Sequence, residues 1–281
     1  MELLERAPYL TELSDLLRQA AAGQGCLVLL GGEAGVGKTA LVRRFSEDVA
    51  TSARLLSGSC DPLSTPRPLG PVLDIAATVG GELNLLATSA APRHQLFGAF
   101  LAELVRGPGP ILVVLEDLHW ADEASLDLVC YLGRRLGSTR GLVIATYRDD
   151  EIGATHPLQL VLGHLATASA VRRLALSPLS VDGVRVLAEE SDLDPVALHG
   201  QTGGNPFYVT EILATGGNGI PATIRDAVLA RAARLSASSR VTLDAAAVIG
   251  SPIEPWLLTA VVDAGTDAAE ACMASGMLRP D

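Results

Sequence analysis

The chain has 281 residues, of which 48% are hydrophobic and 19% charged, and this composition excludes a disordered chain and allows one large domain or two to three smaller ones. No apolar run approaches the ~20 residues that a membrane-spanning helix needs, and the acidic N-terminus lacks a signal-peptide pattern, so we expect a cytoplasmic protein without a membrane partner. The net charge of −11 argues against direct nucleic-acid binding by this segment, because neutralising phosphates requires a basic face.

Strand-like and helical segments alternate along the first two-thirds of the chain. Apolar, strand-like runs lie at residues 26–30, 53–57, 111–115, 142–146 and 171–176, and helical patterns lie at residues 9–22, 39–49, 94–105, 124–136 and 158–166. Such alternation is typical of an α/β fold, with helices on both faces of a mainly parallel, here five-stranded, sheet. Residues 60–71 contain four prolines and are expected to form an extended loop.

From about residue 180 the strand signal fades, and helices are predicted at residues 182–190, 207–214, 241–248 and 254–262. After a glycine-rich break at residues 216–219, Thr223 is expected to cap a further helix. One face of that helix would carry the apolar residues Ile224, Val228, Leu229, Ala232 and Leu235. We expect domains at 1–178, 179–218 and 219–281, the last of them cut short, because residues 275–281 look like an interruption inside a structure.

The single lysine of the chain, Lys38, stands in the motif Gly-Glu-Ala-Gly-Val-Gly-Lys-Thr, while every other basic residue apart from the histidines is arginine. This is the G-x-x-x-x-G-K-[ST] spacing of a phosphate-binding P-loop. Its glycines let successive N–H groups face a phosphate, and lysine offers the β- and γ-phosphates a compact charge that a planar guanidinium does not. A glycine-rich turn is the alternative, but the apolar strand before the motif and the helix after it favour the P-loop. We therefore expect ATP or ADP to bind at Gly32, Glu33, Ala34, Gly35, Val36, Gly37, Lys38, Thr39 and Ala40.

Two adjacent acids, Glu116 and Asp117, follow the buried run at 111–115. A P-loop needs a carboxylate at the end of a neighbouring strand to hold Mg²⁺ and to orient water. We predict a magnesium site made by Thr39 and Glu116, with Asp117 on the side of the attacking water. The usual first acid is aspartate, so the division of roles between the two stays open, as does the alternative of two acids in an exposed turn.

The strand at 142–146 also ends in polar residues. In this fold a residue there lies beside the γ-phosphate, and Thr146 and Arg148 are the candidates. The alternative for Arg148 is a surface ion pair with Asp149, Asp150 or Glu151. Asp122 is expected to be a helix N-cap. The four cysteines and five histidines show no metal-ligand spacing, so the cysteines are expected to be small packing residues.

The run Leu-Glu-Asp-Leu-His-Trp-Ala-Asp at 115–122 resembles the strand-end motif of signal-transduction ATPases of the STAND type, which are AAA+-like, and in particular the large ATP-binding regulators of the LuxR type. Residues 4–6 are similar to the family's N-terminal segment, which implies that Arg6 lies against the base. Residues 203–207 are similar to its glycine-x-proline motif, which implies that Pro206 touches the adenine. Residues 146–149 resemble its sensor strand, and residues 220–250 its winged helix. One departure is Glu5, where the family commonly has glycine.

The resemblance implies a regulatory ATPase in which Lys38, Glu116, Asp117 and Arg148 act on the nucleotide. It also implies a helical lid at 179–218 and a winged-helix-like part, all-α or α+β, from 219. ADP would hold a closed state, ATP would favour an open state that self-associates, and slow hydrolysis would reset the switch. Such regulators usually continue into a helical-repeat sensor and a DNA-binding domain, and these 281 residues look like the ATPase module cut from, or lacking, such an output domain. Two other functions stay open: a phosphotransferase acting on a small acceptor, and a scaffold that binds nucleotide without turnover.

Overall fold

The computed structural model describes residues 3–63, 65–89, 91–153, 155–217, 219–250, 252–262 and 266–278. The chain divides into two compact units, residues 1–179 and 180–281. The assignment of three domains from the sequence stays a prediction. Asn218, the expected last residue of the second domain, and residues 279–281 of the expected interruption lie outside the described residues.

The first unit is built on a five-stranded sheet in which every neighbouring pair of strands is parallel. The order across the sheet is β2-β3-β4-β1-β5. The strands are β1 (Cys26–Gly31), β2 (Arg54–Ser59), β3 (Ile111–Glu116), β4 (Gly141–Thr146) and β5 (Val171–Ala175). The structure confirms the predicted fold class, and each strand lies within two residues of its predicted place.

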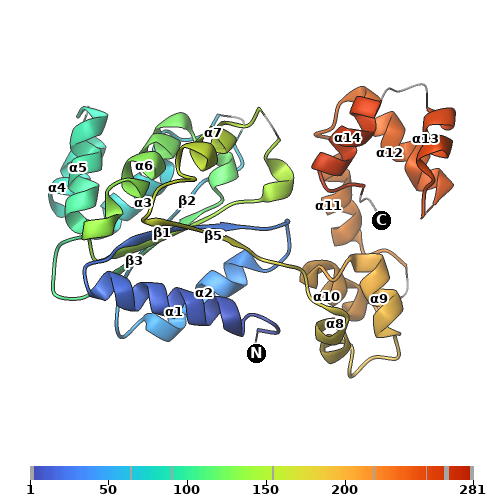
Figure 1. Ribbon diagram of the computed structural model, residues 1–281, viewed down its shortest axis with the longest axis horizontal. Coiled ribbons are helices and arrows are strands. Elements are labelled where there is room, and N and C mark those ends of the chain that lie inside the picture. The colour runs from blue at the N-terminus through green and yellow to red at the C-terminus, as the bar shows by residue number, and fades with distance from the viewer. Residues whose placement is uncertain are drawn as a thin grey trace. The chain divides into compact units, whose positions relative to one another are not determined.

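Successive strand residues face opposite sides of the sheet, so each side has its own core. Val28 and Leu30 of β1 belong to a cluster with side chains of α1 (Ala7–Ala21) and α2 (Lys38–Val49). Leu27 and Leu29 belong to a second cluster on the other face. The helices around that cluster are α3 (Gly70–Val79), α4 (Gly81–Thr88), α5 (Arg93–Glu103), α6 (Glu123–Gly133) and α7 (Pro157–His164). Figure 1 shows α1 and α2 on one side of the sheet and α3, α5, α6 and α7 on the other.

Two helices of the first unit, α3 and α4, were not predicted from the sequence. The prolines of residues 60–71 suggested a loop through Pro71, but Pro71 lies in the first turn of α3. A proline fits there because the first N–H groups of a helix have no partner within the helix. Leu69, just before α3, has a φ angle of 55°, which turns the chain into the helix.

The described part of residues 180–281 is helical and contains no strand, which agrees with the all-α alternative for its second half. Asp194 and Asn205 cap α9 and α10 through their side chains, as Ser180 and Ser236 cap α8 and α12. The helices are α8 (Val181–Leu187), α9 (Pro195–Thr202), α10 (Pro206–Ala214), α11 (Ala222–Ala232), α12 (Ala237–Ile249), α13 (Pro255–Val261) and α14 (Thr266–Ala274). Of these, α9 and α14 were not predicted.

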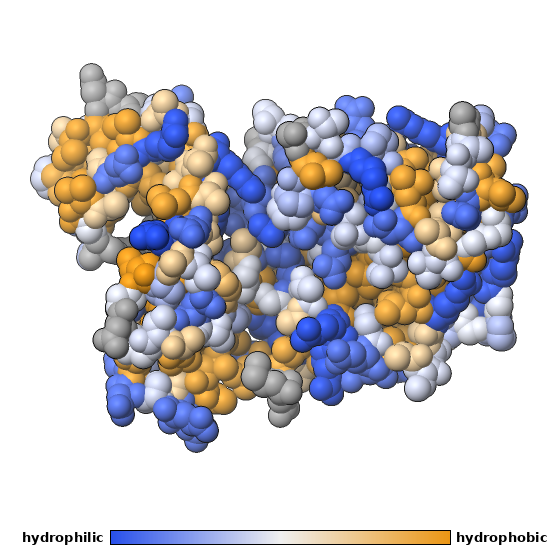
Figure 2. Space-filling model, turned by 180° about the vertical axis from the view of Figure 1, so that it is seen from behind, coloured by the Kyte–Doolittle hydropathy of each residue, from blue (hydrophilic) through white to orange (hydrophobic). Residues whose placement is uncertain are grey.

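The predicted cap of α11 was wrong. The residue before this helix is Pro221, which has no capping side chain, and the Thr223 hydroxyl donates a hydrogen bond to Glu211 instead. The predicted apolar face of α11 is only partly covered, because Ile224 is buried while Leu229 is 58% exposed. Large apolar side chains are also exposed on α12 and α13, among them Val248 and Trp256. Hydrophobic residues gather on this C-terminal part of the chain in Figure 2.

Candidate functional site

Three adjacent strands bring most of the predicted site residues to one edge of the sheet. Leu30 of β1 lies beside Thr146 of β4, and Leu115 of β3 lies beside Ala145 of β4. The loop after β1, the acids at the end of β3 and the polar residues after β4 therefore leave the sheet together. In open α/β sheets, ligands bind at this carboxyl edge of the strands.

The loop between β1 and α2 has a backbone that glycine adopts readily and other residues do not. Gly32, Gly35 and Gly37 have φ angles of 149°, 81° and 102°. A Cβ atom at Gly32 would also lie 2.9 Å from Cγ1 of Val36. The loop leads onto the N-terminus of α2, where backbone N–H groups and the helix dipole favour an anion.

Lys38, the first residue of α2, is only 7% exposed. Its Nζ donates hydrogen bonds to the carbonyl oxygens of Gly32, at 2.6 Å, and Glu33, at 2.9 Å. Burial lowers the pKa of Lys38, and Asp150 is the charge that most opposes this shift. An ammonium held by loop carbonyls, with three donors, can turn to phosphate oxygens without leaving the loop.

Glu116 ends β3 and Thr39 lies in the first turn of α2, and their side chains come close enough for the Thr39 hydroxyl to act on the Glu116 carboxylate. Burial raises the pKa of Glu116, and so does the neighbouring Asp117, whereas the nearby Thr39 hydroxyl lowers it. Mg²⁺ prefers oxygen ligands and is typically held by one or two protein groups together with phosphates. The hydroxyl and the carboxylate fit that donor set. No larger group of metal-binding side chains occurs in the described parts of the chain.

Asp117 has a φ angle of 60°, in the left-handed region that few residues other than glycine adopt. This backbone directs its N–H to the hydroxyl of Thr146 at 3.0 Å, so β4 fixes the residue that follows β3. Burial raises the pKa of Asp117, while Arg148 and Lys38 lower it and Glu151 raises it further. Strained backbone of this kind is common at catalytic sites. Thr146, predicted as one of two sensor candidates, thus positions Asp117.

Arg148 contacts two neighbouring side chains, those of Glu151 and Trp120. Its Nη1 donates to Oε1 of Glu151 at 2.6 Å, and its guanidinium lies 4.7 Å from the centre of the Trp120 ring. The ion pair that was the alternative for Arg148 is therefore present, but the Glu151 side chain in it is buried. A role for Arg148 at the γ-phosphate stays a prediction.

Arg6 ties the N-terminal segment to the phosphate loop. Its Nη2 donates to the carbonyl oxygens of Val36, at 3.1 Å, and Ser177, at 2.9 Å. Arg6 is buried, and burial lowers the pKa of its guanidinium. The preceding residue, Glu5, has a φ angle of 58°, which explains physically why glycine is common at this position in the family that the segment resembles.

Asp122 is confirmed as the N-cap of α6, because its side chain accepts from the N–H groups of Ala124 and Ser125. It also accepts from the N–H of Leu69 at 3.0 Å, just before α3. The Asp122 carboxylate thus caps the N-terminus of α6 and also binds Leu69, the residue just before α3.

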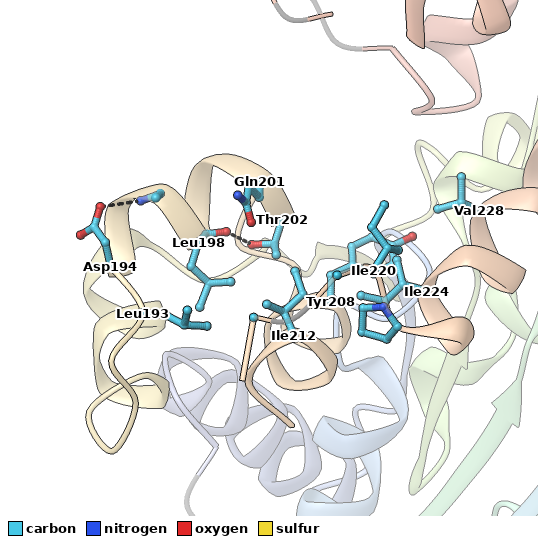
Figure 3. Close-up of a pocket in the computed structure, with 14 residues that line it drawn as sticks. Leu193, Asp194, Leu198, Gln201, Thr202, Tyr208, Ile212, Ile220, Ile224 and Val228 are labelled. Atoms are coloured by element: carbon cyan, nitrogen blue, oxygen red, sulfur yellow. Dashed lines mark hydrogen bonds between the residues drawn. The ribbon is translucent and has the colours of Figure 1, made fainter. Parts of the chain in front are cut away.

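Pro206 lies in the second unit, in the first turn of α10, next to the fully buried Asn205. Its contact with an adenine stays a prediction. The second unit also has a cavity of about 590 Å³, lined by α9, α10, the first half of α11 and the residues Gly217, Gly219, Ile220 and Pro221. Figure 3 shows Ile212, Ile220 and Ile224 among the residues that line it.

Two polar side chains on the wall of this cavity are engaged within α9. Asp194 accepts from the N–H of Ala197 at 3.1 Å, and the Thr202 hydroxyl donates to the carbonyl of Leu198 at 2.7 Å (Figure 3). Most of the other residues that line the cavity are apolar, so its chemistry differs from that of the phosphate loop.

Two residues of the site were missed from the sequence. The ring of His119 is buried, with Nδ1 3.8 Å from Oδ1 of Asp117 and Nε2 3.8 Å from Oε2 of Glu151. The carboxylate of Asp150 accepts the N–H of Ala34, inside the phosphate loop, at 3.2 Å. The available signal was the run of three acids directly after Arg148, which we interpreted only as possible partners of that arginine.

A family model described as AAA ATPase domain matches residues 2–145, just over half of the chain. The chain belongs to the AAA ATPase domain family. An uncharacterised protein of Rhizobium meliloti (strain 1021) is 25% identical to this AAA ATPase over 330 aligned residues. The alignment covers 92% of the chain, and the chain spans only 31% of the length of that relative.

Two solved structures with TM-scores above 0.5 share the fold, and a third chain is similar. Cdc6p from Pyrobaculum aerophilum is 17% identical, with a TM-score of 0.54, over 100% of this chain and 83% of its own. The Orc1 protein of Aeropyrum pernix, solved in complex with DNA, is 14% identical, with a TM-score of 0.54, over 89% of this chain and 74% of its own. A STAND protein with a tetratricopeptide-repeat sensor from Pyrococcus horikoshii is 17% identical, with a TM-score of 0.46, over 95% of this chain and 39% of its own.

The family and the geometry agree on a nucleotide-binding module of the AAA ATPase type. Within the described residues, no helix is both long and apolar enough to cross a membrane.

Proposed function

We propose that this AAA ATPase module binds ATP and ADP with Mg²⁺, hydrolyses ATP slowly and serves as the nucleotide-operated switch of a bacterial transcriptional regulator in the cytoplasm. The observation that carries the proposal is the convergence on one sheet edge of Lys38, the neighbouring side chains of Thr39 and Glu116, and Asp117 with its positive φ angle. The regulatory context is supported by the resemblance of the motifs at 115–122 and 203–207 to LuxR-type regulators.

In the proposed reaction, the N–H groups of the phosphate loop and the N-terminus of α2 bind the phosphates, and Lys38 exchanges its loop carbonyls for their oxygens. Thr39 and Glu116 would hold Mg²⁺, which neutralises charge on the phosphates. Asp117 is suited to orient and polarise a water molecule, because Thr146 fixes its backbone and burial raises its pKa.

The switch follows from differential affinity, since a nucleotide shifts an equilibrium only as far as it prefers one state. Arg148 gives the site a cation whose present partner, Glu151, can be exchanged for a phosphate. The exposed Val248 and Trp256 in the second unit support contacts with another copy or with further domains.

The nucleotide carried by the freshly purified protein tests the proposal. Denaturing the protein and separating the released compounds by chromatography should yield ADP at near one equivalent, which requires an affinity well below about 1 µM. An unoccupied protein that turns over added ATP rapidly would favour the phosphotransferase alternative, and bound ATP that never decays would favour the scaffold.

A further inference from the structure

A side chain from outside the phosphate loop takes up one of the loop's backbone donors. Oδ1 of Asp150 accepts the N–H of Ala34 at 3.2 Å. Asp150 is also the nearby charge with the largest effect in raising the pKa of Lys38, so its carboxylate lies close to the ammonium that the P-loop directs at phosphate. An anion bound to loop N–H groups and near the loop lysine is the arrangement that a phosphate itself would make.

The residue belongs to a short turn with a second anchored acid. The turn is a single 3₁₀ segment, Asp149–Glu151, directly after Arg148. Glu151 binds Arg148 at 2.6 Å and lies 3.8 Å from the buried ring of His119. The same turn therefore contacts the phosphate loop through one carboxylate and restrains the proposed γ-phosphate sensor through the next.

We propose that Asp150 is a specificity-determining residue whose carboxylate competes with the terminal phosphate of ATP and so makes the site prefer ADP. The inference rests on the proposed nucleotide-binding function. A carboxylate beside the phosphate loop repels a bound phosphate, and close like charges are costly when partly buried. The repulsion falls mainly on ATP. Lys38, whose pKa Asp150 raises, and Arg148, two residues before Asp150 in the chain, are the groups expected at the terminal phosphate, which ADP lacks.

Binding of ATP then requires Asp150 to leave the N–H of Ala34. Because Asp150 and Glu151 are adjacent in one turn, that movement also loosens the bond between Glu151 and Arg148. Binding of the terminal phosphate of ATP would thus free Arg148 from Glu151, so that Arg148 can bind this phosphate. The part of the site that binds ADP need not change.

The test compares two substitutions that remove the same charge from the same turn. Asp150→Asn removes the anion at the loop, whereas Asp149→Asn removes an exposed carboxylate one residue earlier. Both proteins are stripped of nucleotide and titrated by calorimetry with ADP and with a non-hydrolysable ATP analogue in Mg²⁺. Asp150→Ala, which also removes the acceptor for Ala34, is the third variant.

The quantity compared is the affinity for the ATP analogue divided by the affinity for ADP. We expect this ratio to rise at least about tenfold in Asp150→Asn and Asp150→Ala and to keep its wild-type value in Asp149→Asn. An equal change in the Asp149 and Asp150 variants would show that only the overall charge matters and would overturn the inference. An unchanged ratio in all three variants would overturn it as well. If wild-type protein binds neither nucleotide, the proposed function fails, which is a separate result.

Discussion

At the scale of single residues, the backbone of Asp117 distinguishes the two acids at the end of β3. Its φ angle of 60° is one that asparagine tolerates and most other residues do not, so Asp117→Asn changes the charge without disturbing the turn. We expect this variant to bind ATP with an affinity within a few-fold of the wild type. Its rate of ATP hydrolysis should fall by a factor of at least about 10². Single-turnover measurements with labelled ATP check both values, and normal hydrolysis would assign the water-side role to another residue.

Glu116 contributes a pH-dependent cost to stability. Because burial raises the pKa of Glu116, the folded state holds a proton there more tightly than the unfolded state. Stability therefore falls as the pH rises from the ordinary glutamate pKa of about 4.3 through the raised value. Glu116→Gln should raise the urea midpoint of the nucleotide-free protein at neutral pH, and this gain should vanish by about pH 3, where both states are protonated.

The matched control for that measurement is Glu12→Gln, at an exposed position on α1. It should leave the urea midpoint nearly unchanged at every pH. A gain of equal size in the control, or a gain in Glu116→Gln that persists in acid, would contradict the explanation.

Some site residues were readable from the sequence because a fixed spacing encodes them. The spacing around Lys38 predicted a loop that the glycine φ angles bear out, and the acids after 111–115 predicted carboxylates at the end of β3. Contacts between distant segments have no such spacing. The bond from Ala34 to Asp150 joins residues 116 positions apart, and those from Arg6 to Val36 and Ser177 join three segments.

At the scale of elements, one carboxylate connects two helices. Asp122 caps α6 and also binds the N–H of Leu69 before α3. Asp122→Ala should destabilise the protein by about 2 kcal/mol, because it removes an N-cap and leaves a further N–H without its acceptor. Asp194→Ala removes a cap that, among the described residues, binds N–H groups at the N-terminus of α9 alone, and it should cost about 1 kcal/mol. Urea unfolding of both variants checks the difference, and equal costs would contradict the connecting role of Asp122.

The strands were predictable because each central strand is buried on both faces and reads as an unbroken apolar run. The helices were less predictable from the sequence than the strands. The cluster of prolines before α3 hid its start, although proline is accepted in a first helical turn. For α9 the signal was present in Asp194 followed by Pro195, a cap and a first-turn residue, but the segment is short and shows no clear apolar period.

At the scale of the whole molecule, nucleotide should stabilise the chain through the first unit. A ligand that binds only the folded state adds RT ln(1 + [L]/Kd), which is about 2.7 kcal/mol at one hundred times Kd. Mg·ADP should therefore raise the unfolding temperature of the wild type in a concentration-dependent manner. Thermal unfolding followed by dye fluorescence checks this, and adenosine without phosphate should have little effect. An equal rise with adenosine would place the main binding energy away from the phosphate loop.

The central claim is that Lys38 and its loop bind the phosphates of a nucleotide. Its most direct test is a calorimetric titration of Mg·ADP into nucleotide-free wild type and into Lys38→Ala, with circular dichroism to show that both are folded. We predict one site per chain in the wild type and an affinity at least about a hundredfold weaker in the variant, a loss of about 2.7 kcal/mol. Equal affinities in two folded proteins, or no binding to the wild type, would contradict the claim.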